Sequence, residues 1–174
     1  MLKRQGAGPW IAAIAAGILL LDQVTKALVV WYLPDQVPWN PIPYLGRLVT
    51  LTLVRNTGAA FGLFSGQSSL LTVVAVGVMA MILLLFRQLP YQRRLIQLSL
   101  GLQLGGAAGN LIDRLRVGHV IDFIDFHFWP VFNVADSAIV IGVIILAYYL
   151  LFLADKEQGH PARAADLSSL DSPS

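Results

Sequence analysis

The sequence predicts a membrane protein built almost entirely of α-helices, and three observations support this fold class. The 174-residue chain has a mean hydropathy of +0.68, with 56% hydrophobic residues and only 13% charged residues. A soluble domain has about 25% charged residues. Four apolar stretches approach the roughly 20 residues that cross a bilayer. We expect transmembrane helices over about residues 10–32, 70–86, 95–112 and 138–153.

The first and third stretches need separate justification. The first follows "MLKRQGAG", as the apolar part of a signal peptide would. It is too long for that and no small-residue cleavage site follows, so we expect it to be retained. The third is weaker because it contains Gln97, Ser99 and Gln103. Glycines recur in it every four residues, at 101, 105 and 109, which favours close packing against another helix.

The basic residues predict the orientation of these helices through the positive-inside rule. Seven lie before the first span, between the second and third, or after the fourth: Lys3, Arg4, Arg87, Arg93, Arg94, Lys156 and Arg163. The two longer loops hold four: Arg47, Arg55, Arg114 and Arg116. We therefore expect both termini in the cytoplasm and both longer loops outside. The basic residues form no continuous stripe, so we expect no nucleic-acid partner.

The remaining compositional features agree with this topology. Trp31, Trp39 and Trp129 fall at the expected outer interface, and Trp10 and Tyr91 at the inner one, as aromatic belts require. Residues 155–174 hold too few apolar side chains to pack, so we expect a disordered cytoplasmic tail after a single membrane domain over 1–154. Cysteine is absent, which excludes disulfides and thiolate nucleophiles.

Short segments in the two outer loops predict β-strands. In residues 49–53 apolar side chains alternate with Thr50 and Thr52, and a period of two is typical of a strand. The small residues of "NTGAAFG" that follow favour either a tight turn or a close backbone approach to another group. In "HVIDFIDFHFW", over 119–129, β-branched and aromatic residues also favour an extended chain.

Alternation along this second strand separates two aspartates. One face would carry Asp122, Ile124, Phe126 and Phe128, and the other Asp125, Ile121, Phe123 and His127. The face of Asp122 is otherwise apolar, which makes this carboxylate the unusual one. Asp136 begins the fourth span, where an aspartate ordinarily caps the helix. Asn133 could fill the same capping role and release Asp136 for another.

Further polar residues fall in or near the spans. Asp22 and Lys26 are four residues apart on one helical face and can pair, either to neutralise each other or as the polar wall of an outward-opening site. Asn110 and Arg114 are also four apart, and the guanidinium could hold a carboxylate or a lipid headgroup. By spacing alone, Asp113 is expected in an exposed salt bridge.

These polar residues map to one level, the outer edge of the bilayer. No order of Ser, His and Asp is apparent, and His119 and His127 are too few for a metal site. Two carboxylates without a metal indicate an aspartic hydrolase. Close like charges keep one group protonated while the other ionises, so that one can act as general base and the other as general acid.

Five sequence blocks in order also resemble one family. "LDQVTK", "RNTGAAFG", "GNLIDR", "GHVIDF" and "FNVADSAI" look like the successive signature blocks of lipoprotein signal peptidase, also called signal peptidase II. The resemblance runs from residue 22 to about 142 with the family's spacing and without departure at the polar signature positions. It implies four spans with a small extracytoplasmic β-cradle formed by the first outer loop.

The resemblance further implies a function and a set of residues. The protein would be a bacterial inner-membrane aspartyl endopeptidase, acting at the outer face on diacylglyceryl-modified prolipoproteins, before the lipidated cysteine. The catalytic aspartates would be Asp122 and Asp136, which overrides the capping interpretation of Asp136. Residues that support substrate or dyad would be Asn56, Asn110, Arg114 and Asn133, with Asp22 and Lys26 as a structural polar pair. Asp125 would lie outside the dyad, and Asp113 would be a structural partner.

Other expectations and alternatives stay open. We expect a monomer without metal or other cofactor, contacting membrane lipids and inhibited by globomycin, the family's known inhibitor. A small proton-coupled transporter is the alternative function, although its acidic groups should lie near the bilayer midplane. A non-catalytic lipid-binding scaffold is a third.

Overall fold

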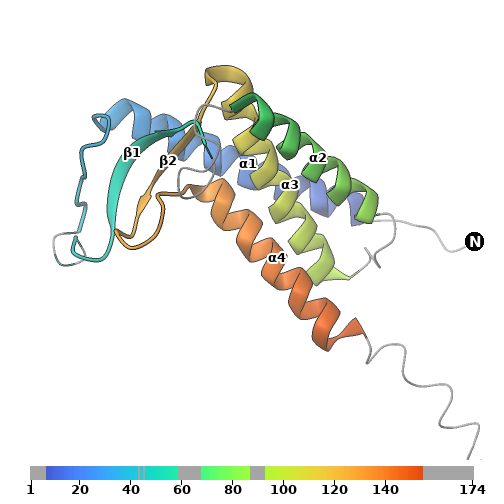
Figure 1. Cartoon of the computed structure of the whole chain (residues 1–174). Coiled ribbons are helices and arrows are strands. Elements are labelled where there is room, and N and C mark those ends of the chain that lie inside the picture. The colour runs from blue at the N-terminus through green and yellow to red at the C-terminus, as the bar shows by residue number, and fades with distance from the viewer. Residues whose placement is uncertain (1–6, 43, 45, 59–67, 87–92, 155–174) are drawn as a thin grey trace, which may run out of the picture.

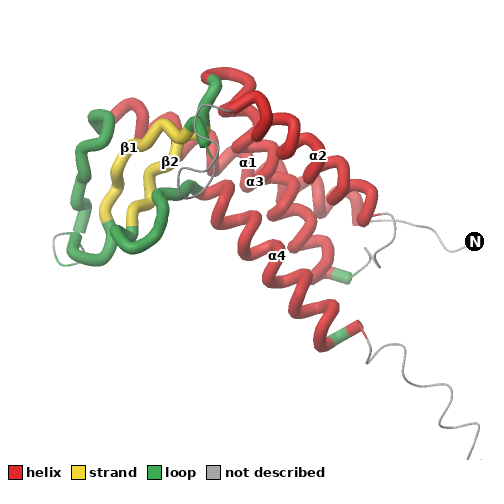
Figure 2. The backbone as a smooth tube through the Cα atoms, viewed as in Figure 1, coloured by secondary structure: helices red, strands yellow, loops and turns green. Residues whose placement is uncertain are grey.

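The computed structural model describes residues 7–42, 44, 46–58, 68–86 and 93–154 (Figure 1). The elements in chain order are α1 (Ala7–Tyr32), β1 (Thr50–Asn56), α2 (Ser68–Phe86), α3 (Arg94–Val117), β2 (Val120–Asp125) and α4 (Val134–Phe152). The helices form a bundle, and the two strands form a small antiparallel sheet beside the end of α1 (Figure 2). The expected tail over 155–174 and Tyr91 lie outside the described residues.

Three of the described helices match the predicted spans by length and hydropathy. Gly8–Tyr32, Arg94–Val117 and Val134–Phe152 are long and apolar enough to cross a membrane. The apolar part of α2 is shorter, Ser69–Leu84. Crossing by α2 therefore stays a prediction.

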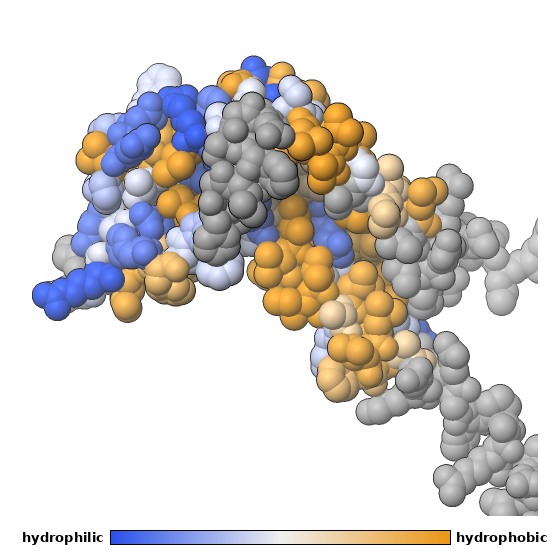
Figure 3. Space-filling model, in the orientation of Figure 1, coloured by the Kyte–Doolittle hydropathy of each residue, from blue (hydrophilic) through white to orange (hydrophobic). Residues whose placement is uncertain are grey.

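The surface of the bundle is that of a protein in lipid. Apolar side chains cover the helices, whereas hydrophilic ones gather over the sheet (Figure 3). On α4, Val140, Ile144 and Leu151 are all more than half exposed. Such a continuous exposed apolar surface is unfavourable in water and is expected where side chains face hydrocarbon.

Helix α3 lies at the centre of the bundle and contacts each of the other helices. This explains its weaker hydropathy, because its polar side chains face protein rather than lipid. Ser99 Oγ donates to the carbonyl of Gly142 on α4 at 2.8 Å, and Gln103 Nε2 donates to Ser99 Oγ at 2.9 Å. Inside a membrane such contacts join helices, since no water competes for the polar groups.

The glycines of α3 set its close contact with α1, as their spacing predicts. A Cβ added at Gly105 would lie 2.6 Å from the carbonyl oxygen of Ala15, and one at Gly109 would collide with the carboxylate of Asp22. Larger residues at these two positions would push the helices apart. The small-residue repeat therefore also brings polar groups of α1 and α3 together.

Two helix ends differ from the prediction by four residues or more, and both differences bear on the site. Helix α3 continues past residue 112 to Val117, and ends where Gly118 adopts a left-handed conformation with φ 78° and donates to the carbonyl of Arg114. Residues 113–117 contain neither glycine nor proline, so the helix continues to Gly118. Helix α4 begins at Val134 rather than at 138, because Asn133 caps it.

The sheet pairs the two predicted strands. Val54 of β1 lies opposite Asp122 of β2, and the register shifts between Leu51 and Val54. Behind the sheet, Val29 of α1 packs with Leu53 and Phe123 in a buried apolar cluster. This cluster attaches the sheet to the end of α1.

The predicted alternation beyond Asp125 is wrong. Strand β2 ends at Asp125, and His127 has a positive φ of 62°. Phe126 and Phe128 stack on each other, with ring centroids 5.9 Å apart, in the turn after the strand. The chain is no longer extended at these residues, so the two phenylalanines do not continue the strand face that carries Asp122.

Candidate active site

The predicted site residues meet at one end of the bundle, where α1 and α3 end and α4 begins, beside the sheet. Asp122 comes from β2 and Asp136 from the first turn of α4. Asp122 is 2% exposed and Asp136 is half-buried. A strand and a helix thus bring two carboxyl groups into one polar cluster.

Asn133 joins the two aspartates. Its Nδ2 donates to Oδ1 of Asp122 at 2.7 Å, and its Oδ1 accepts from the backbone N–H of Asp136 at 2.9 Å. In return, Oδ2 of Asp136 accepts from the backbone N–H of Asn133 at 3.3 Å. This is a capping box. Both capping interpretations therefore hold, and Asp136 keeps its second oxygen for another contact.

Asn110 supplies that contact. Its Nδ2 donates to Oδ1 of Asp136 at 2.7 Å. Its Oδ1 accepts from Nζ of Lys26 and from Nδ2 of Asn133, both at 3.0 Å. An ammonium group can only donate, so Lys26 fixes the orientation of this amide and turns its N–H toward Asp136.

Asn56 supports the other carboxylate from the end of β1. Its Nδ2 donates to Oδ2 of Asp122 at 2.8 Å. Its own Oδ1 accepts from the backbone N–H of Gly58 at 2.9 Å, which holds the amide in place. The two oxygens of Asp122 thus each accept from an amide, of Asn56 and of Asn133.

The environment of Asp122 favours its protonated form. Burial, followed by the charge of Asp136, raises the pKa of Asp122 from 3.8 to about 7, against the hydrogen bonds from Asn56 and Asn133 and the charge of Lys26. A carboxyl group with such a pKa can exchange a proton near neutral pH. The site therefore contains a buried acid that can be protonated beside a second carboxylate.

A second cluster of charged side chains lies next to the two aspartates and is joined to them through Asn110. Nζ of Lys26 lies 2.8 Å from Asp22 and 2.7 Å from Asp113, and these side chains are almost fully buried. The predicted pairing of Asp22 with Lys26 is confirmed. The predicted exposure of Asp113 is wrong, because the continuation of α3 places it against α1. We call Asp22, Lys26 and Asp113 the ion triad.

Sequence reasoning missed two residues that bind the ion triad, Gln23 and Ala135. Gln23 Nε2 donates to Oδ1 of Asp113 at 3.0 Å and to Oδ2 of Asp22 at 3.2 Å. Oδ1 of Asp22 accepts from the backbone N–H of Ala135 at 3.0 Å, next to Asp136. Gln23 lies inside the block "LDQVTK", and its place there could have indicated a role in the site. The contact of Ala135 is made by its backbone N–H, so no side chain in the sequence indicates it.

Arg114 and Asp125 have different relations to the dyad. The half-buried guanidinium of Arg114 feels the charges of Asp136, Asp122 and Asp113, yet within the described residues it forms no ion pair with them. Asp125 accepts from Thr52 Oγ1 at 3.2 Å and from the backbone N–H of His127 at 2.7 Å, outside the cluster. Among the described residues, no three His, Asp or Glu side chains are grouped to hold a metal ion.

Comparison with known proteins agrees with the sequence blocks. Residues 14–152 match the signal peptidase (SPase) II family. The lipoprotein signal peptidase of Moorella thermoacetica is 46% identical over 148 residues, covering 85% of this chain and 97% of that protein. That of Mycobacterium avium is 43% identical over 167 residues, covering 91% and 87%.

Solved structures agree as well. Two bacterial membrane enzyme structures, each 32% identical, superpose with TM-scores of 0.74 and 0.73. The alignments cover 81% of this chain with 87% of the first, and 83% of this chain with 94% of the second. The chain thus shares the fold of these two membrane enzymes over most of its length. The chain belongs to the signal peptidase II family.

Proposed function

We propose that this protein is an aspartyl endopeptidase that removes signal peptides from diacylglyceryl-modified prolipoproteins, cutting before the lipidated cysteine. Family membership supports the removal of signal peptides from prolipoproteins. The aspartic chemistry is supported by one observation above all: Asn133 binds both carboxylates, that of Asp122 through its side-chain amide and that of Asp136 through its backbone N–H, with no cation bonded to either carboxylate in the described residues. Such a pair can hold one proton between two carboxyl groups.

The proposed mechanism uses that single proton. The ionised aspartate takes a proton from a water molecule, which attacks the scissile carbonyl carbon. The protonated aspartate donates a hydrogen bond to the carbonyl oxygen, where negative charge develops. The tetrahedral species then collapses, and a proton passes to the leaving amine. One ionised and one protonated carboxyl group are both required.

The neighbouring amides have the role of positioning groups in this mechanism. Asn56, Asn110 and Asn133 each donate to a dyad oxygen and so hold the two carboxyl groups in one orientation. A rigid dyad lowers the cost of reaching the reactive geometry. Arg114 is available to bind the substrate, because its charge faces the dyad without being consumed by an ion pair in the described residues.

We further propose that the dyad opens at the outer face of the bacterial inner membrane, with both termini in the cytoplasm. α2 would be the fourth span, residues 1–154 one domain, and the monomer the active form, without cofactor and sensitive to globomycin. The chain has no cysteine, so a single Tyr44→Cys variant offers a clean test. Tyr44 is 95% exposed beyond the end of α1. A membrane-impermeant maleimide added outside should label it; labelling only after lysis would reverse the topology.

The function is tested with purified full-length protein and a synthetic prolipoprotein peptide carrying a diacylglyceryl cysteine. Mass spectrometry should find a product that begins with the lipidated cysteine, while the same peptide without lipid is cut far more slowly. Peptide that binds but stays whole would contradict the proposal in favour of a scaffold. Proton movement across vesicles without cleavage would favour a transporter.

A further inference from the structure

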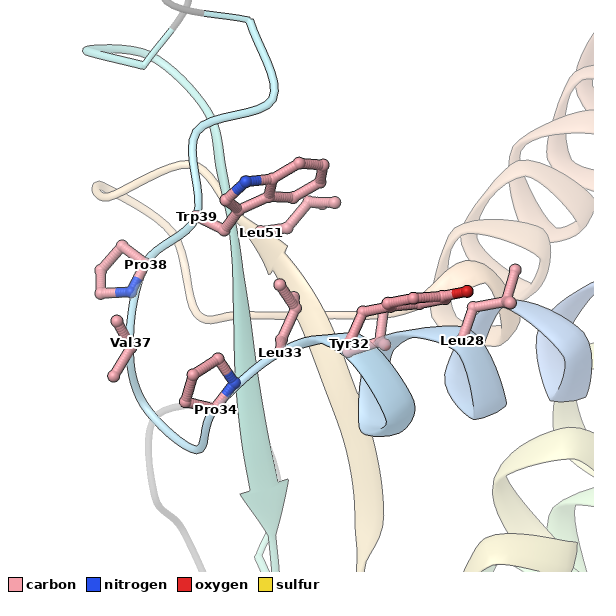
Figure 4. Close-up of a pocket in the computed structure, with 9 residues that line it drawn as sticks. Leu28, Tyr32, Leu33, Pro34, Val37, Pro38, Trp39 and Leu51 are labelled. Carbon is pink, nitrogen blue, oxygen red and sulfur yellow. The ribbon is translucent and has the colours of Figure 1, made fainter.

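A second feature lies away from the dyad, at the outer end of α1. There α1, the segment after it and β1 line an open cavity of about 620 Å³ (Figure 4). Its lining side chains are hydrocarbon apart from the Tyr32 hydroxyl and the Trp39 indole N–H. Of its lining residues, Leu33 and Leu51 are partly buried, whereas Tyr32 and Trp39 are 74% and 51% exposed.

The backbone holds this cavity open. Trp39 and Leu51 exchange backbone hydrogen bonds of 2.8 and 2.9 Å, and the N–H of Gln36 donates to the carbonyl of Leu53 at 2.9 Å. Pro34 and Pro38, which line the wall, have no N–H to offer. A polar ligand would thus find few partners, and a hydrocarbon ligand would fit a largely pre-formed site.

The cavity continues the lipid-facing surface of α1. Leu20, Val24, Leu28 and Tyr32 follow each other at intervals of four residues, which places them on one face of the helix. Their exposed fractions are 66%, 47%, 51% and 74%. The last two also line the cavity. A chain lying along this stripe in the outer leaflet would therefore reach the cavity without crossing a polar barrier.

We propose that this cavity binds an acyl chain of a bilayer glycerophospholipid. Lipid is the solvent of the α1 stripe, so any peptide or second protein copy would first have to displace it. Tyr32 and Trp39 line the cavity and are exposed, and such amphipathic rings suit the headgroup level of a bilayer. The bound chain would fasten the segment 34–39, and through it β1, to the membrane. This site is separate from the proposed dyad and does not depend on it.

Photo-crosslinking of the full-length protein tests this site. The protein is reconstituted in nanodiscs of phosphatidylglycerol and phosphatidylethanolamine that contain a phospholipid with a diazirine in one acyl chain. After irradiation, peptides are mapped by mass spectrometry. Adducts over residues 28–39 should saturate at a low mole fraction of the probe, whereas adducts on the exposed face of α4 should rise in proportion to it.

Two matched variants separate a site from general lipid contact. Val37 lines the cavity and Ile42 does not, and they are 51% and 50% exposed on the same loop. Val37→Asp should lower the adducts over 28–39 by about tenfold, because a carboxylate is costly in an apolar cavity, and Ile42→Asp should leave them unchanged. Unchanged melting temperatures confirm that both variants fold.

Three outcomes would overturn the proposal. Labelling over 28–39 that never saturates would mean ordinary lipid contact. Loss of the adducts on adding lipidated prolipoprotein peptide to the uncleaving Asp136→Asn variant would assign the cavity to the substrate's own chain. Crosslinks between two protein copies through residues 28–39 would assign it to a dimer.

Discussion

Two pairs of buried aspartates lie at the same end of the bundle, yet they are held differently. Asp22 and Asp113 share the ammonium of Lys26, at 2.8 and 2.7 Å. Among the described residues, the carboxylates of Asp122 and Asp136 accept only from neutral amides: Asp122 from Asn56 and Asn133, and Asp136 from Asn110 and the backbone N–H of Asn133. Asn110 connects the two groups, because its oxygen faces Lys26 and its nitrogen faces Asp136.

This difference explains how one polar cluster can serve two purposes. A cation between two carboxylates offsets part of their negative charge, which suits a structural role in a lipid environment. Amides orient a carboxylate but leave its charge uncompensated. In the proposed mechanism, the pair held by amides relieves its repulsion by keeping one proton, and that proton takes part in the chemistry.

The largest expected effect comes from removing one carboxylate of the dyad. Asp122→Asn or Asp136→Asn should each lower cleavage of the lipidated peptide by about 10²–10⁴-fold, since either the base or the acid is lost. An amide fits the same space, but its NH2 group would face an N–H donor that the carboxylate accepted from, so the melting temperature should fall by a few degrees while the variants stay folded. Near-normal cleavage by either variant would remove the dyad from the mechanism.

Disrupting the ion triad should act on stability instead. Lys26→Met leaves Asp22 and Asp113 buried without their cation, which should cost about 3–5 kcal/mol in the free energy of unfolding. The matched control is Arg55→Met, which breaks the ion pair with Asp35, where both side chains are about half exposed. That change should cost less than about 1 kcal/mol. Equal losses of unfolding free energy for Lys26→Met and Arg55→Met would contradict a stabilising role of the ion triad.

The pH dependence of cleavage should reflect the proton held by the dyad. Because the pKa of Asp122 is raised to about 7, raising the pH through that value removes the proton and leaves no acid. A profile of kcat/KM should therefore fall on the alkaline side near pH 7. Linkage gives the sign for stability: this group contributes most at acidic pH, and its contribution is lost as the pH rises through about 7. A flat alkaline limb would contradict this assignment.

A smaller effect should follow from loss of one amide. Asn56 donates to Asp122 and lowers the pKa of that carboxyl group, so Asn56→Ala should move the alkaline limb to higher pH. Cleavage at pH 6 should fall by no more than about tenfold. Thr52→Ala is the control, because Thr52 donates to Asp125 rather than to the dyad. A limb that moves equally in both variants would point to a general loosening of the sheet.

Much of the fold could be predicted from sequence because hydropathy and period are local signals. The apolar stretches placed α1 and α4, and alternation placed β1. Alternation failed after Asp125, where a positive φ at His127 and the stacking of two phenylalanines decide the conformation. Length and composition also left the crossing by α2 undecided.

The site could be predicted only in part from the sequence, because its contacts are not local. The residues of the dyad and the amides stood in recognisable blocks, but which amide faces which carboxylate depends on contacts between distant elements. Asp113 shows this clearly, since spacing favoured an exposed salt bridge while the packing of α3 on α1 buried it. Likewise the bond from Ala135 to Asp22 joins residues 113 positions apart.

Infrared spectroscopy of the carboxyl groups tests the shared proton most directly. The protonated C=O band is recorded as the pH is raised, for the parent protein and for Asp122→Asn. We predict a band that is present at pH 6, disappears with a midpoint near the Asp122 pKa of about 7, and is missing from the variant. The absence of that band from the parent at pH 6, or its persistence in Asp122→Asn, would contradict a dyad that stores one proton.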